Sequence, residues 1–223
     1  MPREIDFFLY IGSTYTYLSL NRVEEIAARE GISLRWRPFN VRAIMMEQGN
    51  RPFVGKPVKL AYMWRDVQRR AERYGIPFES IPDYPVDPEE LANRVAFVSS
   101  LEGWCAEYVK ATYRAWFLEN KPPGDTGELR RLLAELGKDP DKTITRAQSR
   151  EIREMYASET DLAKGMGIFG APSFVCGTEI FWGDDRFEDA VQWCKTHGGR
   201  TSTPNRLPGA RAAPLRPGKT GAE

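Results

Sequence analysis

The chain has 223 residues, of which 41% are hydrophobic and 28% are charged, and its net charge is +1. The near-neutral charge argues against a general nucleic-acid-binding protein. No run approaches the roughly 18 apolar residues that span a membrane. The cysteines Cys105, Cys176 and Cys194 never form a C-x-x-C pair. We therefore expect reduced thiols and a cytoplasmic protein.

The first forty residues predict a β-α-β unit. Residues 5–11 form a short apolar and aromatic run that is typical of a buried strand. Gly12-Ser13-Thr14 interrupts that run, and apolar residues at helical spacing continue to Gly31. Residues 32–38 alternate apolar and polar side chains, which predicts a second strand. The first predicted helix therefore begins beside Ser13.

The middle of the chain has a helical pattern. Helices are predicted over residues 60–74 with Gly75 as the stop, 89–119 with a break near Gly103, 125–136 capped by Asp125, and 145–156 capped by Thr145. Strand patterns return at 173–176 and 179–182, where Gly177-Thr178 predicts a two-residue hairpin turn. Asp184 or Asp185 then caps a last helix over 186–196.

This order of elements predicts an α/β protein with a thioredoxin-like fold (β-α-β … β-β-α) and a large inserted all-helical domain. The thioredoxin-like domain would be discontinuous, with residues 1–40 and 166–198, and the helical insertion would span 41–165. Residues 199–223 carry five basic side chains and one acid, a net of +4 that leaves −3 for the rest. They have few large apolar side chains, so we expect a disordered tail. Its charges are too sparse to favour a nucleic-acid or membrane arm.

The single histidine limits the chemistry that this chain can support. One His argues against a Ser-His-Asp or Cys-His mechanism. Cys194 and His197 are spaced i, i+3, but two ligands are too few for a structural zinc site. No metal site is therefore expected.

The turn after the first strand is the most informative segment. In a thioredoxin-like fold this turn carries C-x-x-C, and those positions are Ser13 and Thr16 here. Neither residue can form a disulfide, so we expect no dithiol oxidoreductase activity. Backbone N–H groups converge at such a turn and favour an anion, including a thiolate from a ligand. The alternative is that Ser13 serves only as a helix N-cap.

Gly170-Ala171-Pro172 precedes the third predicted strand. A Pro at such a place is unusual within a sheet, and the plainest interpretation is a trans loop proline. In a thioredoxin-like fold, however, a cis-Pro faces the first helix. The N–H and C=O of Ala171 would then be free to pair with a peptide ligand as an added strand.

An ordered set of short motifs resembles one family within this superfamily. The motifs are Ser13-Thr14-Tyr15-Thr16-Tyr17-Leu18 (S-P-Y-S-Y-L), Gly49-Asn50-Arg51-Pro52 (G-N-x-P), Lys59-Leu60-Ala61-Tyr62-Met63 (K-x-x-Y-M), Gly75-Ile76-Pro77 (G-I-P), Gly170-Ala171-Pro172 (G-x-P) and Trp182-Gly183-Asp184-Asp185-Arg186 (W-G-[ND]-D-R). Over residues 4–198 they resemble 2-hydroxychromene-2-carboxylate isomerases and kappa-class glutathione transferases of the DsbA-like thioredoxin superfamily. Thr14 departs from the family's usual Pro, which would pre-set the helix start.

The resemblance implies glutathione as cofactor and Ser13 as the catalytic residue that contacts its sulfur. It implies the remaining glutathione contacts at Asn50, Lys59, Ala171, Pro172, Trp182, Gly183, Asp184 and Asp185. Each has a plainer alternative, such as a turn residue for Asn50, a solvated lysine for Lys59 and helix caps for the two aspartates. Arg42 and Tyr84 are candidate contacts for a small aromatic carboxylate substrate, whereas Trp64 is expected in the core.

Three functions remain open on the sequence. The first is a glutathione-dependent isomerase of 2-hydroxychromene-2-carboxylate-like substrates, in which the thiolate adds reversibly. The second is a kappa-like transferase that conjugates electrophiles. The third is a non-enzymatic module that binds peptides at the Ala171-Pro172 edge. A homodimer also remains open, and no nucleic-acid or membrane partner is expected.

Overall fold

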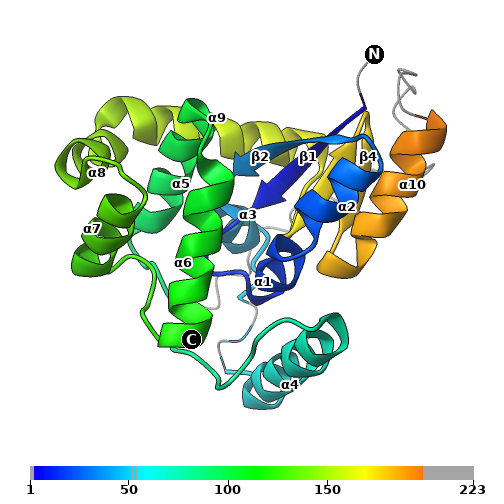
Figure 1. Cartoon of the computed structure of the whole chain (residues 1–223), viewed down its shortest axis with the longest axis horizontal. Helices are drawn as coiled ribbons and strands as arrows, with labels where there is room; N and C mark the ends of the chain where they lie inside the picture. The colour runs from blue at the N-terminus through cyan, green and yellow to red at the C-terminus, as the bar shows by residue number, and fades with distance from the viewer. Residues whose placement is uncertain (1–2, 52, 54, 198–223) are drawn as a thin grey trace, which may run out of the picture.

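A four-stranded mixed sheet forms the centre of the computed structural model, which describes residues 3–51, 53 and 55–197. Its strands are β1 (Glu4–Leu9), β2 (Ser33–Pro38), β3 (Ser173–Cys176) and β4 (Glu179–Trp182), in the order β2-β1-β3-β4 (Figure 1). β1 pairs parallel with β2 and antiparallel with β3, and β3 and β4 form the predicted hairpin. The predicted tail at 199–223 lies outside the described residues.

Helices surround this sheet on several sides. They are α1 (Thr14–Leu20), α2 (Val23–Arg29), α3 (Val41–Glu47), α4 (Pro57–Tyr74), α5 (Leu91–Glu102), α6 (Cys105–Glu119), α7 (Thr126–Glu135), α8 (Pro140–Gln148), α9 (Arg150–Met166) and α10 (Phe187–His197), with a 3-10 turn η1 (Asp184–Arg186) before the last. Figure 1 shows α5 to α8 gathered beside the sheet, α2 and α10 at its other end, and α4 set apart below α1.

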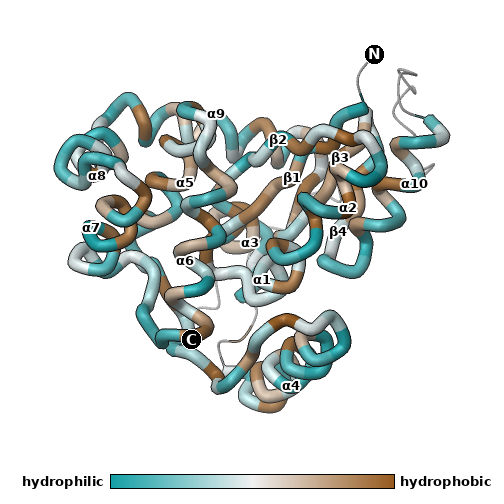
Figure 2. Tube along the Cα trace, viewed as in Figure 1, coloured by the Kyte–Doolittle hydropathy of each residue, from teal (hydrophilic) through white to brown (hydrophobic). Residues whose placement is uncertain are grey.

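Two apolar clusters cover the two faces of the sheet. Side chains alternate along β1, so Phe7 enters the larger cluster while Phe8 enters the smaller one. The larger cluster continues without a break into the helical block, where it includes Trp116 of α6 and Leu133 of α7. Figure 2 shows apolar stretches along β1 and along the helices beside it. The division at residues 40 and 165 stays a prediction, but the core is shared across it.

Two predicted helix boundaries are wrong. The first helix breaks at Asn21-Arg22 into α1 and α2. Thr145 lies inside α8, because Asp139 begins that helix earlier by accepting a hydrogen bond from the Lys142 N–H at 3.1 Å. A separate cap, Ser149, then starts α9. Asp-Pro is a strong helix start, and the sequence analysis overlooked it.

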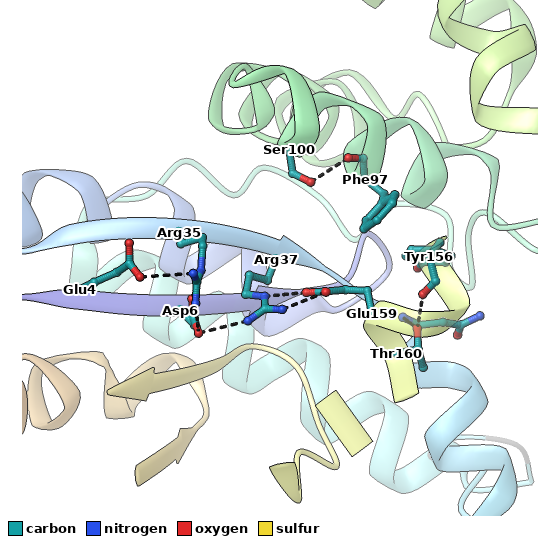
Figure 3. Close-up of polar contacts among 10 residues, drawn as sticks. Glu4, Asp6, Arg35, Arg37, Phe97, Ser100, Tyr156, Glu159 and Thr160 are labelled. Atoms are coloured by element: carbon teal, nitrogen blue, oxygen red, sulfur yellow. Dashed lines mark hydrogen bonds and ion pairs between the residues drawn. The ribbon is translucent and has the colours of Figure 1, made fainter. Parts of the chain in front are cut away.

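A network of charges fixes α9 across the end of β1 and β2 (Figure 3). Arg37 Nε and Nη2 donate to the two carboxylate oxygens of Glu159 on α9, at 2.6 and 2.8 Å. Arg37 also reaches Asp6 on β1 at 3.2 Å, and Arg35 Nη2 donates to the same carboxylate at 2.8 Å. These bidentate contacts have the geometry in which Arg–carboxylate pairs are strongest, so they hold α9 in register with the sheet.

The shared core predicts cooperative unfolding. Leu133→Ala should destabilise the protein by about 2–5 kcal/mol, because Leu133 is fully buried and its loss leaves a cavity. In urea, near-UV and far-UV circular dichroism should shift to the same lower midpoint. Leu101→Ala on exposed α5 surface is the control and should change little. Two separate transitions, with only the helical one shifted, would show that the block unfolds on its own.

Candidate functional site

Two segments that are 158 positions apart meet at Ser13. The Ser13 hydroxyl donates to the Ala171 carbonyl at 2.8 Å, and the Ala171-Pro172 bond is cis. Ser13 is also the N-cap of α1, because its Oγ accepts from the Thr16 N–H at 3.4 Å. The predicted juxtaposition of Ser13 and Pro172 is therefore confirmed, and the N-cap interpretation of Ser13 holds alongside it.

The backbone of Ala171 is only half free. The prediction that both its N–H and its C=O are available is wrong for the carbonyl, because that oxygen already accepts the Ser13 hydroxyl. Within the described residues, the Ala171 N–H has no hydrogen-bond acceptor. Ala171 is half-buried and Pro172 is buried. An open donor thus lies directly beside the Ser13 hydroxyl.

Trp182 and Gly183 flank the cis-proline from β4. The Gly183 N–H donates to the Pro172 carbonyl at 2.9 Å. The Trp182 indole covers Gly170 so closely that a Cβ there would lie 2.1 Å from its Nε1. Trp182 is 53% exposed, and its ring meets Phe169 edge to face at 4.7 Å between centroids. A large aromatic surface therefore stands open next to the Ala171-Pro172 edge.

Asp184 and Asp185 differ sharply in environment. Asp184 is 1% exposed, and its Oδ2 lies 2.8 Å from Arg70 Nη2 and 3.9 Å from Arg22 Nη2. Burial raises the pKa of Asp184 to about 7 although both arginines oppose that rise. Asp185 is exposed and pairs with Arg186 at 2.9 Å. Burial is the largest single effect on Asp185 and opposes ionisation, but Arg186 and Arg70 together outweigh it and hold the pKa of Asp185 below its usual value.

The last helix begins one residue later than predicted. Asp184 and Asp185 form the turn η1, and α10 starts at Phe187. The Arg22 guanidinium also donates to the Asp184 carbonyl. Asp185 is consequently the carboxylate of the pair that is open to a ligand.

One face of α4 attaches to the start of α1. The Thr14 hydroxyl donates to Met63 Sδ at 3.0 Å, and the Tyr15 hydroxyl donates to Asp66 Oδ2 at 3.0 Å. Thr14 stands where the family has Pro, so this residue joins α1 to α4 through a side chain that Pro lacks. Arg70, which holds Asp184, lies one turn beyond Asp66 on the same face.

Lys59 and Asn50 lie at exposed positions on α4 and after α3. Lys59 lies one turn before Met63 on α4, is exposed, and has no ion-pair partner in the described part of the chain. Asn50 follows α3, where its N–H donates to the Met45 carbonyl at 2.8 Å and its side chain is exposed. The structure shows no contact between either residue and Ser13.

Of the two substrate candidates, Tyr84 lies in an aromatic cluster and Arg42 is already engaged. The Tyr84 ring meets Trp64 and Phe53 edge to face, at 5.8 and 5.9 Å between centroids. Trp64 is buried, as predicted for a core residue. Arg42 donates to Glu90 Oε1 at 2.8 Å and to the carbonyls of Val86 and Asp87 at 3.0 and 3.1 Å. We therefore do not retain Arg42 as a substrate contact.

The sequence did not reveal the residues of α5 and α6 that bond to the backbone of the Ser13 turn. The Asn93 side-chain amide on α5 accepts from the Ile11 N–H and donates to the Ile11 carbonyl. The Tyr113 hydroxyl on α6 lies 2.8 Å from the Tyr10 carbonyl and 2.9 Å from the Ser13 carbonyl. The sequence signal that could have identified Asn93 is its amide side chain among the mostly apolar residues of α5.

The described residues contain no cluster of three or more His, Cys, Asp or Glu side chains that could bind a metal ion. The His197 ring stacks on Trp193 at 3.8 Å, whereas Cys194 is buried with its thiol directed at the Glu4 carbonyl. All three cysteines are unpaired and buried. No helix among residues 3–51, 53 and 55–197 is both long and apolar enough to cross a membrane.

A mixed sheet with a cis-proline opposite the start of the first helix defines a thioredoxin-like protein. The DSBA-like thioredoxin domain model matches residues 4–192, and the chain belongs to this family. It is 30% identical to a 2-hydroxychromene-2-carboxylate isomerase of Pseudomonas putida, covering 82% of this chain and 89% of that protein. It is 24% identical to glutathione S-transferase kappa 1 of Caenorhabditis elegans, covering 84% and 88%. A solved 2-hydroxychromene-2-carboxylate isomerase superposes with a TM-score of 0.76 at 27% identity, covering 87% and 97%.

A largely buried carboxyl group, that of Glu90, bonds to Tyr10 at the start of the Ser13 turn. Glu90 Oε1 accepts from the Tyr10 hydroxyl at 2.7 Å and from Arg42 at 2.8 Å, while its Oε2 has no partner among the described residues. Burial raises the pKa of Glu90 to about 7. The Tyr10 ring in turn lies against Gly12, where a Cβ would be 2.8 Å from Tyr10 Cε1. Glu90 is thus linked to the turn through the Tyr10 side chain.

The raised pKa of Glu90 predicts a pH dependence of stability. Between the ordinary value of 4.5 and about 7 the folded chain binds more protons than the unfolded chain. The free energy of unfolding should therefore fall as the pH rises through this window, by an amount on the order of 1–3 kcal/mol. Glu90→Gln keeps an acceptor for Tyr10 and Arg42, so its stability should vary less with pH. Parallel pH profiles of the two urea midpoints would contradict this assignment.

Proposed function

We propose that this protein is a glutathione-dependent isomerase acting on 2-hydroxychromene-2-carboxylate-like substrates. The observation that carries the proposal is the 2.8 Å hydrogen bond from Ser13 to Ala171, beside a cis-proline. Ser13 stands at one of the two positions where a dithiol protein has its cysteines, and the open Ala171 N–H belongs to the residue that accepts its hydroxyl. The similarity to curated isomerases along most of the chain supports the same activity.

The residues at the site fit a tripeptide thiol. The open Ala171 N–H suits a peptide carbonyl, as in strand addition. Asp185, whose pKa lies below its usual value, suits the ammonium of the γ-glutamyl group. The unpaired Lys59 suits a carboxylate. Asn50, Pro172, Trp182 and Gly183 complete the proposed glutathione site, with Asp184 supporting it through Arg70.

Ser13 has a single hydroxyl proton, and this limits how it acts. In the structure the proton is directed at the Ala171 carbonyl. Turning the hydroxyl toward a bound sulfur removes it from that carbonyl. The freed Ala171 oxygen then becomes an acceptor for a peptide N–H, so the Ala171 backbone gains its second pairing group when Ser13 engages the thiol.

Bound glutathione would supply a thiolate that adds reversibly to an electron-poor carbon of the substrate. A free thiol of pKa about 8.5 is roughly 3% ionised at pH 7. Lowering that pKa by about 2 units would raise the thiolate fraction about 25-fold, whereas the lower basicity costs about tenfold in nucleophilicity. The net gain is only about 2–3-fold. The main contribution of Ser13 is therefore to fix the position of the sulfur.

Tyr84 is the proposed substrate contact. The Tyr84 cluster with Trp64 and Phe53 offers aromatic edges to a ring. The unpaired thiols support a reducing compartment such as the cytoplasm.

A kappa-like glutathione transferase is the second candidate, favoured by the similarity to two Caenorhabditis elegans proteins of that name. The two activities differ in their products. Incubation with 2-hydroxychromene-2-carboxylate and glutathione should give an isomer with glutathione undiminished. A stable conjugate would identify a transferase instead. Absence of any reaction and of retention on immobilised glutathione would contradict both.

Ser13→Ala should retain binding to a glutathione column and lose most turnover, because the remaining residues still hold the tripeptide while the sulfur loses its fixed position. The measurement is kcat with and without glutathione. Ser19→Ala is the control, since Ser19 lies in the same helix, is fully buried and has no hydrogen-bond partner for its hydroxyl among the described residues. Equal turnover in the Ser13 variant and the wild type would remove Ser13 from the mechanism.

Ser13→Cys should form a mixed disulfide with oxidised glutathione, because it places a thiol within reach of the bound sulfur. Intact-protein mass spectrometry should show one added glutathione. The wild type is the control, and its three buried cysteines should stay unmodified. Modification of both proteins to the same extent would show that the sulfur binds elsewhere.

A further inference from the structure

We infer that Asn93 is a positioning residue that sets the geometry of Ser13 from the opposite side of the turn. Its Oδ1 accepts from the Ile11 N–H at 2.7 Å, and its Nδ2 donates to the Ile11 carbonyl at 2.8 Å. Asn93 lies on α5, 82 positions from Ile11, and both residues are fully buried. The amide therefore pairs with both the N–H and the C=O of Ile11, two residues before Ser13, as a residue of a neighbouring strand would.

No other group takes over this pairing. β1 ends at Leu9, so Ile11 lies beyond the last pair of the sheet. Within the described ranges, the Ile11 N–H and C=O have no hydrogen-bond partner besides Asn93. A buried peptide group without partners is strongly disfavoured. The Ile11 peptide must therefore move if the Asn93 amide is removed.

Asp87 fixes which way the Asn93 amide points. Its Oδ2 accepts the second Nδ2 hydrogen at 2.9 Å and the Asn93 backbone N–H at 3.1 Å. A flipped amide would direct its oxygen at both this carboxylate and the Ile11 carbonyl. The orientation that matches the Ile11 peptide is thus the only one that satisfies the amide.

Asp87 is itself held rigidly. Its Oδ1 accepts from the Ala92 N–H at 3.1 Å, and its own N–H donates to the Pro123 carbonyl at 3.1 Å. Gly124 packs so tightly that a Cβ would lie 2.6 Å from Asp87 Oδ1. Asp87 therefore holds the Asn93 amide, and the Asn93 amide holds the backbone of Ile11, two residues before Ser13.

The effect on Ser13 follows from its short connection to Ile11. The Ser13 N–H donates to Tyr10 O at 3.0 Å, which closes a tight turn around Ile11 and Gly12. Ser13 Oγ must lie within reach of both Thr16 N–H and Ala171 O. A shift of the Ile11 peptide moves Ser13 relative to these two groups. The consequence for catalysis rests on the proposed function, but the positioning does not.

A thiol placed at position 13 reports this geometry without glutathione. In a Ser13→Cys background, the pH dependence of iodoacetamide alkylation gives the pKa of the introduced thiol. The native cysteines are buried, so the label should be selective. The Thr16 N–H should stabilise the thiolate. Adding Asn93→Leu, which keeps the side-chain size but has no amide, should raise the pKa by about one unit. Below the midpoint this lowers the thiolate fraction about tenfold, and the higher nucleophilicity offsets about threefold of that loss, so alkylation should slow about threefold.

Ser99→Ala is the matched control, because Ser99 is buried on the same helix and its hydroxyl donates to Ala96 O at 2.6 Å, away from the Ile11 backbone. It should leave the alkylation profile unchanged. Asp87→Asn keeps the side-chain size but disturbs the orientation of the Asn93 amide, so it should raise the thiol pKa by a smaller amount. If Asn93→Leu does not fold, the Asp87→Asn variant decides the question. An unchanged pKa in whichever of these variants folds would overturn the inference.

The same variants separate this inference from the proposed function. With Ser13 restored, Asn93→Leu should lower kcat about tenfold with little change in the KM for glutathione. A raised thiol pKa in a protein that shows no glutathione-dependent turnover would uphold the role of Asn93 and reject the proposed function. A lowered kcat with an unchanged thiol pKa would reject the positioning role.

Discussion

The whole site depends on a tight turn, Tyr10 to Ser13, that is held by hydrogen bonds from three separate parts of the chain. Ala171 receives the Ser13 hydroxyl from the side of the cis-proline. Asn93 and Tyr113 hold the backbone of the same turn from the helical block. None of these partners is near the turn in sequence. The inserted helices are therefore part of the machinery that shapes the Ser13 turn as well as a cover for the sheet.

Local patterns predicted the architecture well. Alternation and turn residues located all four strands to within two residues, and Gly75 and Gly103 end helices in left-handed conformations as glycine favours. Ser13 and Pro172 could be paired because the order of elements indicated a known topology. The error at Thr145 arose because the caps Asp139 and Ser149 lie within a few positions of it, whereas α2 begins after Arg22 without any side-chain cap that the sequence could have indicated.

The supporting contacts could not be predicted in the same way. Asn93 in sequence is one amide in an apolar helix, and only tertiary structure shows that Ile11 lacks another partner. Arg42 was assigned to substrate because it is a cation near Asn50, yet Glu90 and two carbonyls occupy it. Long-range polar pairing of this kind leaves no periodic trace in the sequence.

The buried state of the three thiols has a consequence for selectivity. Burial raises the pKa of Cys105 and of Cys176 to about 12, and Cys194 is 1% exposed. At neutral pH the Cys105 and Cys176 thiols are protonated, and all three sulfurs are shielded by burial, so an electrophile entering the protein meets no accessible competing thiol. For the proposed function, in which glutathione supplies the reacting sulfur, this means that the protein's own thiols do not compete with glutathione for the substrate.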